Sequence, residues 1–105
     1  MSIDKTEKID VVKRNSDGSL RLVLTDDREW GDDEHLWLLQ EKLNSYIAFI
    51  ETGQVREMDG VGPDTSVWIE IVTRHEPDDG GRKFLRLAGE KIAGAGIPMI
   101  QRIEP

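Results

Sequence analysis

The chain has 105 residues, a length that suits one domain with a single hydrophobic core, and no run of residues is apolar enough to cross a membrane. It contains no cysteine, which excludes disulfides, thiolate nucleophiles and thiolate metal ligands and fits a reducing compartment. Its 14 Lys and Arg against 21 Asp and Glu give a net charge of −7, which opposes binding to phosphate backbones. We therefore expect a cytoplasmic protein with neither nucleic acid nor a membrane as its partner.

The first part of the chain predicts a flexible leader followed by a β-hairpin. Residues 1–8 are mostly polar and charged, and we expect the folded domain to span residues 9–105. Residues 9–14 and 19–26 flank Asn-Ser-Asp-Gly, a sequence typical of a tight turn. In the second strand leucines alternate with polar or smaller side chains, so that the leucine face should meet a helix.

Residues 34–53 predict the longest helix of the chain. One of the aspartates just before it should accept the free amide hydrogens of its first turn, and Gly53 should end it in the left-handed conformation. A stripe of side chains at steps of three and four residues predicts its core face: Leu36, Leu39, Leu43, Tyr46, Ile47 and Ile50. Trp37 and Ala48 fall instead on the opposite, polar face.

The remaining residues predict a loop, two more strands and a second helix. The glycine-rich residues 54–66 predict a loop, and residues 67–74 predict a central strand with large apolar groups on both faces. Residues 82–93 predict a helix, and residues 99–103 a last strand. We expect Phe84, Leu85, Ala88, Ile92 and Ala95 to face inward.

The order of these segments predicts an α+β fold, an α/β two-layer sandwich with the order β-β-α-β-α-β. If every crossover moves the same way, right-handed crossovers place the last three strands parallel and both helices on one face of a four-stranded mixed sheet. The first strand, joined by the tight turn, should be antiparallel and lie at an edge unless the strand order is interleaved, so the sequence leaves the strand order open.

The predicted long helix also carries a family resemblance. Residues 35–46, HLWLLQEKLNSY, and residues 49–54, FIETGQ, resemble the signature helix of a family of small bacterial proteins of unknown function. The resemblance extends over about residues 20–55, with a weaker echo at Phe84-Leu85 and Gly96-Ile97. It implies a small standalone α/β protein and brings no catalytic residues.

Two groups of side chains are candidates for a site. The first, which we call the acidic rim, lies where the strands end and the helices begin, the edge at which open parallel sheets usually bind ligands. Such carboxylates with a histidine can hold a divalent cation, act as acid and base, or attract a basic partner. Its residues are Asp26, Asp27, Asp32, Asp33, His75, Asp78 and Asp79.

We expect the acidic rim to consist of helix caps and solvated carboxylates rather than a metal site. The positive ends of two helix dipoles disfavour a cation there and attract aspartates. The spacing of the acids also matches no known cation-binding loop.

The second candidate is an interaction surface centred on Trp37, because tryptophan is favoured at the centres of protein interfaces. Its expected residues are Trp37, Ala48, Trp30, Glu41 and Asn44. The alternative is structural: Trp30 folds back over the first turn of the helix, and Trp37 lies beneath the long loop or the leader.

No nucleotide-binding motif, catalytic residue, metal site or cofactor site is predicted, because the glycine pairs complete no phosphate-binding pattern and no serine lies in a nucleophile elbow. The sequence therefore favours a non-enzymatic module that binds a protein partner or forms a homodimer. The alternative is a metal-dependent or small-molecule-binding enzyme that uses the acidic rim.

Overall fold

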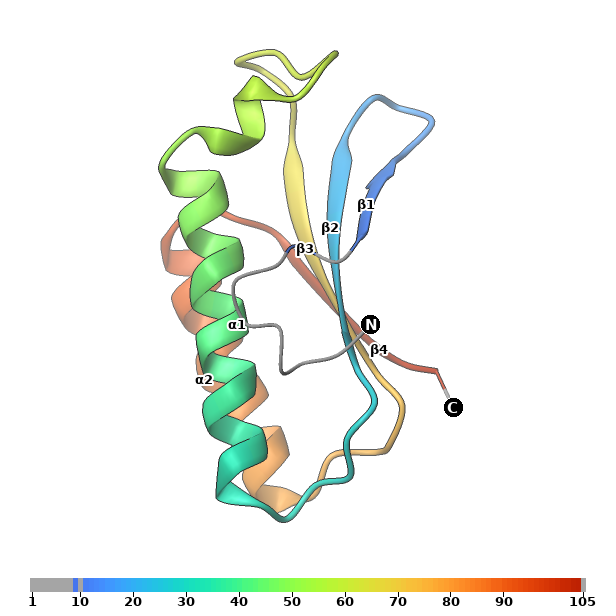
Figure 1. Cartoon of the computed structure of the whole chain (residues 1–105), viewed down its shortest axis with the longest axis vertical. Helices are drawn as coiled ribbons and strands as arrows, with labels where there is room; N and C mark the ends of the chain where they lie inside the picture. Colours follow the sequence, from blue (N-terminus) through green and yellow to red (C-terminus); the bar gives the residue numbers. More distant parts are fainter. Residues whose placement is uncertain (1–8, 10, 105) are drawn as a thin grey trace.

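The computed structural model describes residue 9 and residues 11–104, so the expected leader at residues 1–8 lies outside the described part. Its elements follow the predicted order and form one four-stranded mixed sheet with the strand order β1-β2-β3-β4 (Figure 1). The strands and helices are β1 (Val11–Arg14), β2 (Leu20–Asp26), α1 (Asp33–Glu51), η1 (Gln54–Glu57), β3 (Val67–Thr73), α2 (Asp79–Gly94) and β4 (Met99–Ile103).

The sheet has the predicted strand directions. β1 pairs with β2 in the antiparallel sense, while β2, β3 and β4 run parallel to one another, so β1 lies at one edge and β3 is internal. The hairpin turn closes through a hydrogen bond of 3.0 Å from Gly18 N to Asn15 O. Gly18 adopts a φ of 89°, which a residue without a Cβ adopts at little cost.

Both long helices are capped at their N-termini by aspartate. Asp32 Oδ1 accepts from Glu34 N at 2.8 Å, and Asp78 Oδ1 accepts from Gly81 N at 2.8 Å. These bonds satisfy amide groups that have no partner within the helix. At the other end of α1, Gly53 has a φ of 84°, which ends the helix as its sequence predicts.

The core lies between the sheet and the helices, which occupy the same side of the sheet in Figure 1. Leu22 of β2, Ile69 of β3, Leu39 of α1 and Ile92 of α2 are all fully buried in one hydrophobic cluster. The cluster therefore joins both layers of the sandwich.

Three details of the second helix and the loop differ from the sequence prediction. The second helix begins three residues earlier than predicted, because Asp78 is its cap and Gly80 and Gly81 form its first turn. Ala95, expected to face inward, is exposed beyond the helix end. The predicted loop after α1 begins with the 3₁₀ helix η1, which buries Val55 completely.

The buried face of α1 also differs from the predicted stripe. Leu36 and Ile50 are half-buried, whereas the polar residues His35 and Lys42 are buried. The apolar periodicity identified most of this face, but two polar side chains complete it.

Candidate functional site

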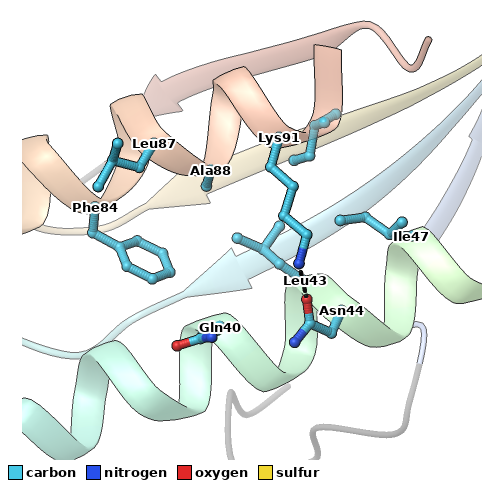
Figure 2. Close-up of a pocket in the computed structure, with 9 residues that line it drawn as sticks. Gln40, Leu43, Asn44, Ile47, Phe84, Leu87, Ala88 and Lys91 are labelled. Atoms are coloured by element: carbon cyan, nitrogen blue, oxygen red, sulfur yellow. Dashed lines mark hydrogen bonds between the residues drawn. The ribbon is translucent and has the colours of Figure 1, made fainter. Parts of the chain in front are cut away.

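A groove runs between α1 and α2 on the side of the helices that faces away from the sheet (Figure 2). It has a volume of about 260 Å³. Across it, Lys91 Nζ donates to Asn44 Oδ1 at 3.1 Å, so the two helices are tied at that level. The lining residues are Gln40, Leu43, Asn44, Ile47, Phe84, Leu87, Ala88, Lys91 and Ile92.

Two large apolar side chains are exposed at or near this groove: Leu87 lines it, and Trp37 lies outside its lining. Trp37 has 57% of its surface exposed and Leu87 has 50%, the two highest values among large hydrophobic residues of the described chain. Trp37 precedes the groove residue Gln40 by three positions, and helical spacing therefore places it on the same side of α1, one turn away. We call the groove together with Trp37 and Leu87 the helix-pair surface.

The other residues expected near Trp37 have separate positions. Asn44 lines the groove, and helical spacing places the half-buried Glu41 and the exposed Ala48 on the same outward side of α1 as Trp37. Trp37 is not covered by the loop that follows α1, and the alternative that the leader covers it concerns residues 1–8, outside the described part. Trp30, by contrast, is engaged inside the domain.

Trp30 connects the starts of the two helices. Its Nε1 donates to the backbone oxygen of His75 at 3.0 Å, and its ring centroid lies 4.3 Å from that of His35. A Cβ added to Gly81 would lie 2.5 Å from Trp30 Cε3, so the indole packs directly on the first turn of α2. This is the structural role that the sequence offered as the alternative for Trp30.

The acidic rim divides into caps, exposed carboxylates and one buried residue. Asp32 and Asp78 are the helix caps, and Asp27, Asp33 and Asp79 are exposed. Asp26 is completely buried, and His75 is half-buried. Within residues 9 and 11–104, no group of three or more His, Asp or Glu side chains is arranged to hold a metal ion.

Asp26 forms a buried pair with His35. His35 Nε2 lies 2.5 Å from Asp26 Oδ2, and His35 Nδ1 lies 3.1 Å from the backbone oxygen of Glu29. A carbonyl oxygen only accepts, so Nδ1 carries a hydrogen, and Nε2 forms the hydrogen bond with Asp26 Oδ2. The other oxygen of Asp26, Oδ1, accepts from Arg28 N at 3.1 Å. The geometry joins the end of β2 to the start of α1.

A second buried carboxylate lies on the opposite face of the sheet. Glu70 is 1% exposed, and its Oε1 accepts from Arg102 Nε at 2.8 Å and from Arg21 Nη1 at 3.3 Å. Burial alone raises the pKa of Glu70, but the hydrogen bond from Arg102 and the charges of Arg102, Arg21 and Lys13 outweigh it and hold the pKa below its usual value. These two contacts join β2, β3 and β4 across the sheet.

Sequence reasoning did not single out Leu87, the Asp26–His35 pair or the Glu70 pairs. Leu87 lies among polar residues, Lys83 and Glu90, on the outer side of α2. Trp37 likewise lies on a polar helix face, so a helical projection of α2 could have identified Leu87 in the same way. The carboxylate pairs depend on strand register and on the entry angle of α1, for which the sequence contains no local signal.

None of the helices formed by the described residues is both long and apolar enough to span a membrane. In comparisons with known proteins, no curated protein and no solved structure matches this chain. A family of proteins does match it over nearly its whole length, at residues 1–104. The chain belongs to that family, a family of unknown function designated DUF6572.

Proposed function

We propose that this chain is a non-enzymatic protein-interaction module and that its binding surface is the helix-pair surface. The observation that carries the proposal is the exposure of Leu87 in an apolar groove and of Trp37 one helical turn from the groove residue Gln40. Tryptophan and leucine rarely stand this exposed together on a monomer surface, and covering them removes a large apolar area from water. For a protein partner that covers this surface, the largest contribution to the binding free energy should come from Trp37.

The size and shape of the groove also favour a protein partner over a small molecule. Pockets for small ligands usually enclose roughly 300–1,000 Å³ and bury most of the ligand. This groove is smaller, at about 260 Å³. It lies between two parallel helices, and inserted side chains of a partner would fill it.

The acidic rim gives less support to the alternative enzyme. Its capping aspartates are bonded to helix amides, and Asp26 is committed to His35 and to Arg28 N. These bonds supply a structural reason for the residues that a metal or acid–base site would need.

Fluorine NMR on protein labelled with 5-fluorotryptophan tests the proposal. The three tryptophans give three resonances, of which Trp37→Phe identifies one and the other two serve as internal references. We expect the Trp37 resonance to show a large solvent isotope shift in dilute protein and to lose it when the surface is covered. Leu87→Ala should weaken that change, whereas Ile103→Ala, at a residue 46% exposed on β4, should not.

The proposal is wrong if the Trp37 resonance keeps its full isotope shift both in concentrated protein and in clarified lysate of the source cell. A change confined to the Trp30 and Trp68 resonances would also count against it, because that change would place binding elsewhere.

A further inference from the structure

We infer that the helix-pair surface binds a second copy of this chain, in a two-fold arrangement that places α1 of each copy against α2 of the other. The inference rests on the proposed function, because it names the partner of that surface. It is carried by the way in which charge is divided between the two helices.

The two helices carry opposite charge. In α1 the acidic residues are Asp33, Glu34, Glu41 and Glu51, and its one lysine, Lys42, is fully buried. In α2 the basic residues are Arg82, Lys83, Arg86 and Lys91, against the acidic Asp79 and Glu90. An acidic ridge therefore lies beside a more basic ridge on one surface, with the apolar groove between them.

A surface divided in this way is complementary to itself in one orientation. The helices are parallel, since each follows a parallel strand of the sheet (Figure 1). A two-fold axis along the groove places the acidic α1 of one copy opposite the basic α2 of its partner, and the same contact occurs twice. An axis across the helices pairs α1 with α1 and α2 with α2, which brings like charges together. Charge complementarity selects the first orientation.

The residues along the helices also meet at matching levels. The hydrogen bond between Asn44 and Lys91 places these two residues at the same height along the helix axes. A rise of about 1.5 Å per residue places Trp37 roughly 10 Å from that height, toward the N-terminus of α1. Leu87 and Lys83 lie about 6 Å and about 12 Å before it on α2. An axis parallel to the helices keeps these levels, so Trp37 of one copy packs between Leu87 and Lys83 of the other.

Glu41 and Arg86 form the charged rim of the same contact. Both lie about 5–8 Å before the Asn44–Lys91 level. Helical spacing places Glu41 beside Trp37, toward the flank of α1 that is further from α2, and Arg86 on the flank of α2 that is further from α1. The two-fold axis along the groove brings those flanks together. Each dimer therefore contains two Glu41–Arg86 contacts, one at either margin of the apolar seam.

The available area suits a weak but specific dimer. The helix α1 has 19 residues and is about 28 Å long, and two adjacent helices are about 20 Å wide, so one copy presents roughly 560 Å². Two copies then bury about 1,100 Å², just above the ~1,000 Å² expected of a biological interface. The dimer should therefore form at micromolar rather than nanomolar concentrations.

Sedimentation equilibrium between roughly 5 and 500 μM, a range chosen to bracket a weak association, tests the orientation through a charge swap. Glu41→Arg and Arg86→Glu should each weaken the dimer about 3- to 30-fold, because each replaces two opposite-charge contacts by like-charge contacts. Mixing the two variants should restore wild-type affinity, since both contacts of the mixed dimer again join opposite charges. Trp37→Ala should weaken dimerisation at least 30-fold by removing two buried anchors.

Glu57→Arg is the matched control, because it makes the same charge change at an exposed residue of η1 outside both long helices. It should not weaken the dimer, and mixed with the Arg86→Glu variant it should restore less affinity than Glu41→Arg does, because only one of the two contacts of that mixed dimer joins opposite charges. Circular dichroism of each variant separates loss of association from loss of folding.

A dimer that the mixture fails to restore, or that Trp37→Ala leaves intact, overturns this inference. So does a wild-type chain that stays monomeric to 500 μM, a ceiling set by the roughly micromolar association expected. If that monomer still loses the Trp37 isotope shift on binding another protein, the proposed function stands and only the second copy is rejected. If the shift persists in every condition, both proposals fail.

Discussion

His35→Phe is expected to be the most destabilising conservative substitution on α1. Phenylalanine keeps a flat ring against Trp30 but removes the partner of Asp26, which is fully buried. It also removes the hydrogen bond to the Glu29 carbonyl. Deleting the hydrogen-bond partner of a buried carboxylate costs about 3–5 kcal/mol, because the carboxylate is then left without that compensation in the interior.

That cost is large relative to the total free energy of unfolding of the domain. A domain of this size has a free energy of unfolding of about 5–15 kcal/mol, and each 1 kcal/mol moves Tm by roughly 4–8 °C. A loss of 3 kcal/mol should therefore lower Tm by at least about 12 °C. Urea denaturation followed by circular dichroism, with thermal melts on the same samples, measures both quantities.

Asp26→Asn provides a sharper comparison at the same site. The asparagine oxygen can still accept from Arg28 N, and its amide can donate to a neutral His35 that carries its hydrogen on Nδ1. We expect Asp26→Asn to cost less than half as much as His35→Phe. His75→Phe, at the other histidine, should change stability by less than about 1 kcal/mol. A loss below 1 kcal/mol for His35→Phe would refute the assignment of this pair as a main stabilising contact.

Two further predictions concern the opposite sheet face and the start of α2. Glu70→Gln should destabilise the domain by about 1–3 kcal/mol at neutral pH, because two charge-assisted bonds are weakened. Since the pKa of folded Glu70 is lowered, this advantage of the wild type is complete above the usual value of 4.5 and is lost as pH falls through the lowered pKa. Urea titrations at several pH values should show the gap closing on acidification, and a gap independent of pH would contradict the pairing. Gly81→Ala should cost about 1–3 kcal/mol by forcing the Trp30 ring away, whereas Gly94→Ala, with nothing within 4 Å of its added Cβ, should be neutral or slightly stabilising. Equal thermal melts for these two variants would refute the contact between Trp30 and α2.

The sequence determined the elements and their directions because those depend on local patterns. The alternating leucines were sufficient to predict β2, and the three- and four-residue spacing was sufficient to predict α1. The aspartates before each helix indicated where the helices are capped. The start of α2 was misplaced because Gly80 and Gly81 look like a turn. Glycine is tolerated in a first helical turn, where the amide groups lack helical partners, and Asp78 supplies the bond.

The polar interior could not be read from the same patterns. His35 is placed by its position on α1, but its pairing with Asp26, nine residues earlier, requires that the chain between them fold back through Trp30. Glu70 stands between Trp68 and Val72, and only the register of β2 and β4 brings Arg21 and Arg102 to it. Local periodicity therefore identifies which side chains are apolar neighbours, whereas the partners of buried charges are set by tertiary structure.

These internal pairs also bear on where this fold can bind a partner. In open parallel sheets the carboxyl edge is the usual ligand site, because strand ends and helix N-termini leave a crevice there. In this chain Trp30, His35 and Asp26 occupy the space between the ends of β2 and β3 and the starts of both helices. Opening that edge for a ligand would break the Asp26–His35 pair and separate Trp30 from α2. The outer side of the helix layer needs no such rearrangement, because Trp37 and Leu87 are already exposed and the groove between the two helices is already formed. Binding at the helix-pair surface would therefore leave the Asp26–His35 pair and the packing of Trp30 on α2 intact.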